Sequence, residues 1–127
     1  MWIYLSHPCV PAEYSEKGLN ELTGEEKVKV TKIADDNRGQ ASFIARNLQK
    51  TNPEHLIISP LNAGSFIIGN RTEHLEYDIG LLEKCQGIIF TGDWKSSLGC
   101  MAEYGFAKAK GMKRFTYDIN FKLKEAK

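Results

Sequence analysis

The sequence predicts an α/β domain built on a small doubly wound parallel sheet of about four to five strands, with helices on both faces. Three observations lead to this prediction. Short apolar runs alternate with stretches of helical periodicity, and clusters of Gly, Pro, Asn and Ser separate the two kinds of segment. The chain of 127 residues is also long enough for one core and too short for two. Residues 1–127 are therefore expected to form a single domain.

The predicted strands are short and apolar. Residues 2–5 form the first strand, and a Ser-His-Pro loop ends it. Residues 56–59 form the second strand, which Pro60 terminates, and residues 87–91 form the third. Residues 114–117 form a fourth strand, and a basic tail follows it.

A polar segment, residues 9–34, comes before the first predicted helix. Part of it could form a helical turn, and the rest has two interpretations, either a mobile loop or lid over a site, or a solvated excursion of the chain. From Asp35 the pattern becomes helical, with Asp35 or Asp36 as the cap, and Asn52-Pro53 stops the helix. Its apolar stripe consists of Ala41, Ile44, Ala45 and Leu48.

Two further helices are predicted, each after a loop. Residues 60–71 form the first loop, and Thr72 caps a helix that runs to Cys85. Residues 92–96 form the second loop, before a helix that Gly111 ends. The apolar stripes of these helices are Leu75, Ile79 and Leu82 in the first, and Leu98, Met101, Ala102, Gly105, Phe106 and Ala109 in the second.

The alternation of strands and helices implies parallel strands joined by right-handed crossovers. In a flavodoxin-like order, 2-1-3-4, the chain direction reverses between the first and third strands. Ligands of such sheets bind in the crevice beyond the carboxyl ends of the strands at this switch point. The loops that flank the crevice are Ser6-His7-Pro8 and residues 92–99. The topology therefore predicts a ligand site in the crevice between these two loops.

Composition excludes several classes of function. Seventeen basic and sixteen acidic residues leave a net charge of +1, so a nucleic-acid polymer is not an expected partner. The longest apolar run is too short to span a membrane. Met1 is not followed by a signal-type segment, and the three cysteines are widely spaced. A reduced, cytoplasmic protein with no metal and no cofactor is expected.

Small polar residues mark the start of the last helix. Ser96, Ser97 and Gly99 could bind an anion through hydroxyls and backbone N–H groups, or one serine could simply cap the helix. Asp93 and Trp94 precede them in the same loop. Trp94 could stack on a base or close the loop over the core.

Two carboxylates and one histidine are further candidates. Glu103 lies off the apolar stripe of its helix and could face the crevice as a nucleophile or base, or be an ordinary exposed acid. Asp78 has the same two interpretations. His7 lies at the end of a strand, where it could touch a ligand or be structural, and no ligand cluster around it indicates a metal.

Three parts of the sequence resemble a known family. They are Tyr4 ahead of a small-residue loop, Asp78, and the segment Ser97-Leu98-Gly99-Cys100-Met101-Ala102-Glu103-Tyr104-Gly105. Together with Leu82, Cys85 and Trp94, they resemble the small uncharacterised bacterial and phage branch of the nucleoside 2-deoxyribosyltransferase-like superfamily. That superfamily includes deoxyribosyltransferases and nucleotide N-glycosidases. The resemblance covers the chain from Ile3 to about Met112.

The resemblance implies a role for each matching residue. Glu103 would be the nucleophile at the anomeric carbon, Asp78 would orient the sugar or protonate the leaving base, and Tyr4 would lie near Glu103. Ser97 and Gly99 would bind the 5′ end of the sugar or its phosphate. Asn37, which with Arg38 is predicted to start the first helix, falls where the branch often has Asn and either contacts the ligand or caps the helix.

Two functions follow as expectations. The first is an enzyme that cleaves or transfers at the N-glycosidic bond of a nucleoside or nucleotide, through a glycosyl-enzyme intermediate on Glu103. The second is a non-catalytic module that binds a nucleotide or sugar phosphate in the same crevice. For either function, the expected ligand contacts include Ser6, His7, Asp93, Trp94 and Ser96. A homo-oligomer is expected in either case, because the relatives complete their sites across subunit interfaces.

Overall fold

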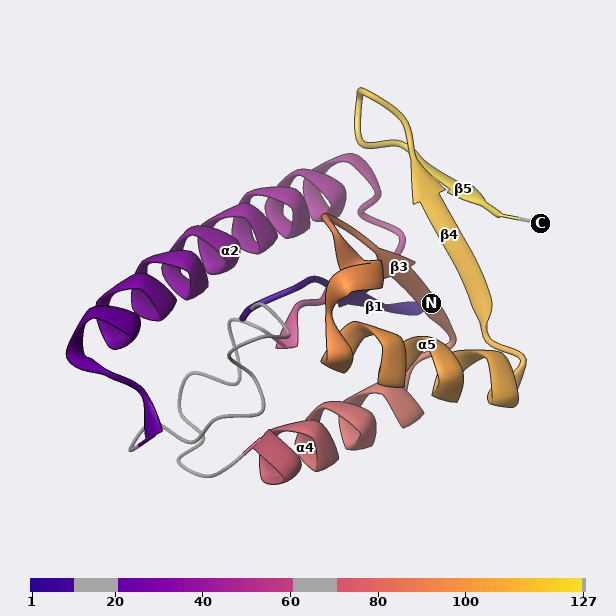
Figure 1. The fold of residues 1–127 in the computed structure, drawn as a ribbon. Coiled ribbons are helices and arrows are strands. Elements are labelled where there is room, and N and C mark those ends of the chain that lie inside the picture. The colour runs from indigo at the N-terminus through magenta and orange to yellow at the C-terminus, as the bar shows by residue number, and fades with distance from the viewer. Residues whose placement is uncertain (11–20, 61–70, 127) are drawn as a thin grey trace.

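The computed structural model describes residues 1–10, 21–60 and 71–126 of the chain (Figure 1). The predicted loops over 11–20 and 61–70 lie outside the described residues. In chain order the elements are β1 (Trp2–Ser6), α2 (Gly24–Thr51), β2 (Leu56–Ile58), α4 (Arg71–Glu83), β3 (Gly87–Phe90), η3 (Trp94–Ser96), α5 (Leu98–Lys110), β4 (Lys113–Tyr117) and β5 (Leu123–Glu125). The predicted α/β class is confirmed, with every predicted strand present.

The described strands form one five-stranded sheet in the order β2-β1-β3-β4-β5. The first four strands are parallel, and their order is the predicted one. The interior strand β1 pairs on both sides, so that Tyr4 stands opposite both Ile58 and Ile88. Part of the basic tail forms a fifth strand, because Leu123–Glu125 pairs antiparallel with β4 and makes the sheet mixed.

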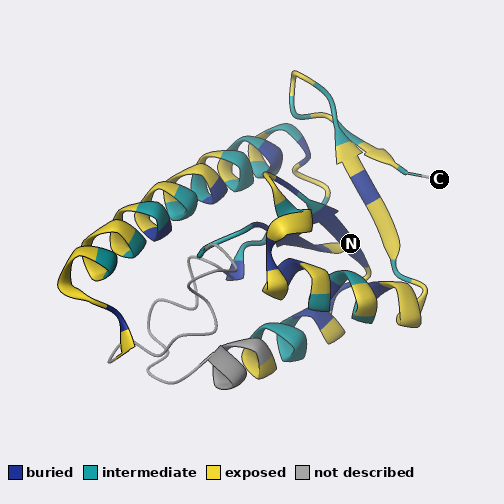
Figure 2. Cartoon of the chain, viewed as in Figure 1, coloured by how far each residue is buried: buried dark blue, intermediate teal, exposed yellow. Residues whose placement is uncertain are grey.

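The two faces of the sheet carry separate cores. Because side chains alternate along a strand, Ile3 and Leu5 of β1 pack with Ala41 and Leu48 of α2, whereas Tyr4 packs on the opposite face. Tyr4 is accompanied there by Leu82, Cys85, Ile88 and Ala107 of α4, β3, α5 and the residues between them. Helix α2 therefore covers one face, and α4 and α5 cover the other (Figures 1 and 2).

Helix α2 begins at Gly24, whereas the predicted helix starts at Asp35. Thr23 is its N-cap and forms a capping box with Glu26, in which each side chain accepts a hydrogen bond from the other residue's backbone N–H. Asp35 and Asp36 are exposed residues inside the helix, not its cap. The part of the polar segment from Gly24 onward is thus helical, and neither loop interpretation holds for it.

The other helix boundaries follow local capping chemistry. Thr72 lies within α4, so its predicted role as the N-cap is wrong. Helix α5 is capped as expected, since the Ser97 side chain accepts from the backbone N–H of Cys100. Gly111 ends α5 in the left-handed conformation, at a φ of 67°. In the described residues, no helix is both long enough and apolar enough to cross a membrane.

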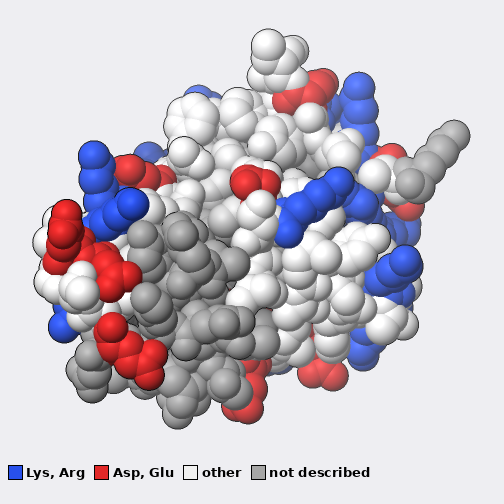
Figure 3. All heavy atoms as spheres, in the orientation of Figure 1, with Lys and Arg blue, Asp and Glu red and all other residues white. Residues whose placement is uncertain are grey.

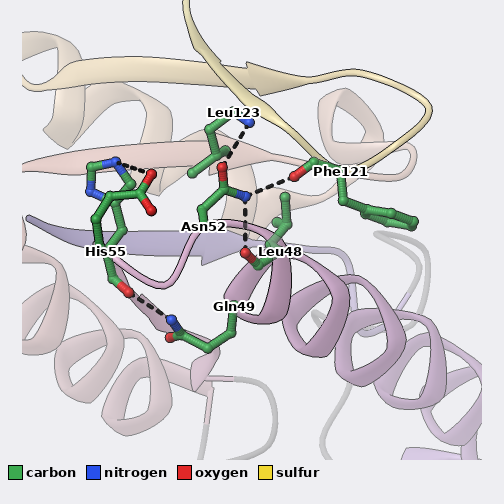
Figure 4. Close-up of polar contacts among 7 residues, drawn as sticks. Leu48, Gln49, Asn52, His55, Phe121 and Leu123 are labelled. Carbon is green, nitrogen blue, oxygen red and sulfur yellow. Dashed lines mark hydrogen bonds and ion pairs between the residues drawn. The ribbon is translucent and has the colours of Figure 1, made fainter.

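Asn52 joins the end of α2 to the β4–β5 hairpin (Figure 4). Its side chain is almost fully buried, and its amide nitrogen donates to the carbonyl oxygens of Leu48 and Phe121, at 2.9 and 2.7 Å. Its amide oxygen accepts from the backbone N–H of Leu123 at 3.2 Å. One side chain thereby satisfies three backbone groups and fixes β5, the edge of the sheet, against the helix.

We expect Asn52→Ala to lower the free energy of unfolding by about 2 kcal/mol, because buried backbone groups lose their partners. Urea denaturation measures this loss. The control is Asn47→Ala on the same helix, where the amide donates to the Phe43 carbonyl at the exposed surface. That change should cost no more than about 0.5 kcal/mol. Equal losses in the two variants would contradict the role assigned to Asn52.

Candidate functional site

Buried polar residues gather where β1 and β3 end and α5 begins. The described residues that are both polar or charged and buried include Ser6, His7, Thr91, Ser97 and Glu103. Ser6 ends β1, Thr91 follows β3, and Ser97 caps α5. The carboxyl ends of adjacent parallel strands are the usual place for a ligand in an open α/β sheet. Buried polar groups at this position form the candidate site.

Glu103 is the centre of this cluster. Its carboxylate accepts hydrogen bonds from two residues of β1: the Tyr4 hydroxyl donates to Oε2, and Ser6 Oγ donates to Oε1 at 2.9 Å. Cys100, Glu103 and Ala107 are the buried residues of α5, spaced so that all three face the sheet. Glu103 is only 6% exposed, so its alternative interpretation as an ordinary exposed acid is wrong.

Burial is the largest influence on the pKa values of Glu103 and Tyr4. It raises the pKa of Glu103 from 4.5 to about 7, with a further rise from the Asp78 charge and a partial offset from the Tyr4 and Ser6 hydrogen bonds. Burial, the Glu103 charge and the Asp78 charge raise the pKa of Tyr4 well above its usual value. Tyr4 therefore remains a hydrogen-bond donor at neutral pH, while Glu103 is divided between its two protonation states.

Asp78 approaches this pair from another helix. It is a half-buried residue of α4, and its charge raises the pKa values of Tyr4, Glu103 and Cys100. The structure joins Tyr4 of β1 and Glu103 of α5 by a hydrogen bond, and Asp78 of α4 acts on both of them through its charge.

At the start of α5, Ser97 caps the helix and Gly99 leaves its backbone accessible. Ser97 is buried and uses its hydroxyl to accept from the Cys100 N–H, so the capping interpretation holds for this residue. Ser96 is exposed, in the last position of η3. A Cβ at Gly99 would meet only Ser97 Oγ, at 3.9 Å, so the described residues leave the space beside this backbone free.

Asn37 and Arg38 do not start a helix. They lie in the middle of α2, where Asn37 Nδ2 donates to the Cys9 carbonyl oxygen at 2.7 Å. Arg38 forms an exposed ion pair with Asp35 at 3.3 Å. The helix-start role is therefore wrong. Through this hydrogen bond, Asn37 connects helix α2 to the segment that follows β1.

Trp94 belongs to a ring cluster on the surface of the sheet. Its ring centroid lies 4.5 Å from that of Phe90 and 5.4 Å from that of Tyr104, and the Arg114 guanidinium lies 5.4 Å from it. This packing fits the interpretation in which Trp94 closes the loop. Asp93 is exposed and makes no side-chain capping bond to η3. Neither residue is brought to Glu103 by a described contact.

Basic side chains also gather on this side of the molecule. Lys108 and Lys110 lie in the last turn of α5, and Figure 3 shows Lys and Arg over the α5 and β4 side. Two of these charges are paired in exposed contacts, Lys110 with Glu83 and Lys113 with Glu125, each at 3.9 Å. Exposed pairs at such distances contribute little to stability.

His7 lies on the face of the sheet opposite to Ser6. It is buried, and its Nδ1 lies 2.7 Å from Thr91 Oγ1. Burial lowers the pKa of His7, and Gln40 of α2 partly offsets this effect. Of the two interpretations of His7, the structural one explains these contacts. Thr91 was not expected, although it could have been found by the rule that nominated Ser6, since it directly follows a strand.

Gly92 makes room for the His7 ring. Its φ is +63°, and a Cβ there would lie 2.9 Å from His7 Cε1. We expect Gly92→Ala to lower the free energy of unfolding by about 2 kcal/mol, through backbone strain and contact with the ring. Gly105→Ala in α5 is the control, because its Cβ would meet nothing within 4 Å. Thermal unfolding should show Gly105→Ala unchanged or stabilised, as a helix-interior glycine predicts.

The described residues show no group of three or more His, Cys, Asp or Glu side chains that could hold a metal ion. The three cysteines are free. Burial raises the pKa of Cys100 to about 11, although the Ser6 and Ser97 hydroxyls oppose the rise. A thiol with so high a pKa is a weak nucleophile, so Glu103 is the stronger nucleophile candidate in this cluster.

Two surface hollows lie elsewhere. One, of about 540 Å³, is lined by α2 residues between Lys27 and Asp36. The other, of about 450 Å³, lies at the opposite end of the sheet from Glu103, and its lining includes Met1, Phe106 and Met112. Neither lining includes a residue of the candidate site.

Comparison of the chain with protein-family models, with curated proteins and with solved structures found no match. The resemblance to the nucleoside 2-deoxyribosyltransferase-like superfamily therefore rests on the residues themselves. Its strongest part is the segment from Ser97 to Gly105.

Proposed function

We propose that this protein acts on the N-glycosidic bond of a nucleoside or nucleotide, with Glu103 as the nucleophile. One observation carries the proposal: a carboxylate that is 6% exposed, and is held on both oxygens by hydroxyls of β1, lies at the carboxyl end of the sheet. Isolated buried carboxylates are costly, so one retained at a ligand-binding edge is a candidate for function.

The proposal includes the finer features of the fold and the assembly. The strand order and the two helix-covered faces support a doubly wound, flavodoxin-like domain of the nucleoside 2-deoxyribosyltransferase-like superfamily. Within that proposal the protein is a cytoplasmic homo-oligomer. Light scattering at micromolar concentration tests the assembly, and a strict monomer would contradict it.

The chemistry uses the ionised form of Glu103. One carboxylate oxygen attacks C1′ of the sugar, the C1′–N bond breaks, and the base leaves with the bonding electrons. A proton reaches the departing base from Asp78 or from water. The glycosyl ester then breaks when water or a second base attacks C1′, which regenerates the carboxylate, and the proton of the attacking group passes to Asp78 or to solvent. Tyr4 and Ser6 orient the carboxylate, and hydrogen bonds to its charged form lower the pKa of Glu103.

The test is incubation of the purified protein with a panel of nucleosides and nucleoside 5′-monophosphates, with and without a second free base. Chromatography follows release of the first base and formation of a new nucleoside. Release without exchange indicates hydrolysis, and exchange indicates transfer. An enzyme preparation that neither releases nor exchanges any base would overturn the proposal.

A second candidate is a module that binds a nucleotide or sugar phosphate and leaves it intact. The observation that favours it is the protonation of Glu103: burial stabilises the neutral form, and a neutral carboxyl is not a nucleophile. For such a module, the same panel should raise the melting temperature of the protein without any release of base.

A further inference from the structure

We propose that Thr91 and His7 are positioning residues that brace the end of β1 and so hold the Ser6 hydroxyl against Glu103. The inference concerns how the carboxylate is held, and its catalytic consequence rests on the proposed function. Thr91 holds the carbonyl group of Ser6, His7 holds Thr91, and the peptide between Ser6 and His7 links the two faces of the sheet.

The first step is the fixation of the Ser6 carbonyl group. Its oxygen accepts two hydrogen bonds from one residue of the neighbouring strand end, from the Thr91 backbone N–H at 3.0 Å and from Thr91 Oγ1 at 3.1 Å. The backbone bond continues the β1–β3 pairing by one residue beyond Phe90. The hydroxyl bond adds a second restraint at the point where the ladder ends and the backbone would otherwise be freer to rotate.

The second step is the contribution of His7. A threonine hydroxyl has one proton, and the proton of Thr91 goes to the Ser6 carbonyl oxygen. At the 2.7 Å contact, His7 Nδ1 must therefore donate and Thr91 Oγ1 must accept. The neutral ring is thus assigned the tautomer with its proton on Nδ1. His7 is buried against Gly92, so the ring has little freedom to leave Thr91.

The third step carries the restraint to the other face of the sheet. Ser6 and His7 are consecutive residues, so their side chains leave the strand end in opposite directions. Ser6 Oγ reaches Glu103 on the α5 side, whereas His7 Nδ1 contacts Thr91 Oγ1. Rotation of the shared peptide would move both side chains, so the bonds to Thr91 also hold Ser6 Oγ at its 2.9 Å contact with Glu103.

The test reads the carboxyl group directly by NMR titration of Glu103 in protein carrying ¹³C-labelled glutamate. The Ser6 hydrogen bond favours the charged form of Glu103, so Ser6→Ala should raise the midpoint of the titration by about one pH unit. Thr91→Val, which keeps the shape and removes the hydroxyl, should raise it in the same direction by about half a unit or more.

Conservative variants separate positioning from a general effect on folding. Thr91→Ser keeps the hydroxyl and should restore the wild-type midpoint, and Thr116→Val, at an exposed position of β4, should leave it unchanged. If Thr91→Val does not fold, the pair His7→Asn and His7→Leu gives the same comparison. Asn can still donate toward Thr91, whereas Leu cannot.

The tautomer of His7 provides an independent readout. The ¹⁵N spectrum of the wild-type ring should show a protonated Nδ1 and an unprotonated Nε2. A ring protonated only on Nε2, or a Thr91→Val variant that titrates as the wild type does, would overturn the inference. None of these measurements requires turnover. If the wild type releases no base but the midpoints shift as expected, the proposed function fails and the positioning role stands.

Discussion

Glu103→Gln should reduce the turnover number for base release by at least about a thousandfold, while the affinity for the nucleoside or nucleotide changes little. The amide has nearly the shape of the carboxylate, so it can occupy the same place between Tyr4 and Ser6. It lacks the negative charge, and its neutral oxygen is a much weaker nucleophile toward C1′ than a carboxylate oxygen. The glycosyl ester then cannot form, although the other residues of the candidate site are unchanged. Steady-state kinetics and ligand-induced stabilisation measure the two effects.

Glu76→Gln is the matched control for this experiment. Glu76 is an exposed residue of α4, and its replacement removes the same charge from the surface. Its turnover should equal that of the wild type. Loss of activity in Glu103→Gln alone would assign the chemistry to the buried carboxylate, whereas undiminished turnover in Glu103→Gln would exclude it as the nucleophile.

Gly99→Ala distinguishes ligand binding at the start of α5 from simple capping. The new methyl group would meet no described protein atom closer than 3.9 Å, so the folded protein should retain its stability. If a ligand approaches this backbone, the methyl group occupies its space, and we expect KM to rise about tenfold with kcat little changed. An unaltered KM would limit this end of α5 to the capping role of Ser97.

The sequence predicted β1, β2 and β3 because each is a short apolar run, and β1 and β3 are mostly buried. Strand β5 escaped that signal, since Leu123, Lys124 and Glu125 form a mostly polar edge strand. Its position depends on a local turn, in which the Asp118 carboxylate accepts from the N–H groups of Asn120 and Lys122, each at 2.9 Å. This Asp-x-Asn pattern was the signal that could have predicted the hairpin.

The start of α2 was missed for a similar reason. The stretch from Gly24 to Ile33 has few apolar residues, so periodicity indicates no buried face there, although Thr23 and Glu26 carry the spacing of a capping box. Capping chemistry and hydrophobic periodicity are independent signals. Where α2 extends beyond the core, the sequence carries the capping signal but no hydrophobic periodicity.

Periodicity could nominate Glu103 but could not decide whether it is buried. Its contact with Tyr4 joins residues 99 positions apart, and no local pattern records which strand lies under a helix flank. The switch-point rule brought Ser6, Ser97 and Glu103 to one end of the sheet, because it depends only on strand order. It did not separate the two faces of that end, and His7 consequently was grouped with residues that lie on the far side of the sheet.

The same carboxyl group should make the stability of the protein depend on pH. Its pKa is about 7 in the folded protein and 4.5 as the ordinary value, so the folded state retains the proton over a range where the unfolded chain has lost it. The stabilising effect of this proton is complete below about pH 4.5 and disappears as the pH rises through about 7. Above that range, the folded protein bears the cost of a buried charge.

Glu103→Gln should therefore become more stable than the wild type as the pH rises. The difference in the free energy of unfolding should grow between about pH 5 and about pH 8 by roughly 3 kcal/mol, at about 1.4 kcal/mol per pKa unit. Urea denaturation at several pH values measures it, with Glu76→Gln expected to run parallel to the wild type. Parallel curves for Glu103→Gln as well would mean that Glu103 titrates normally. A difference that grows with pH, together with lost turnover, would identify a carboxylate kept in the core at the expense of stability because the chemistry requires its charge.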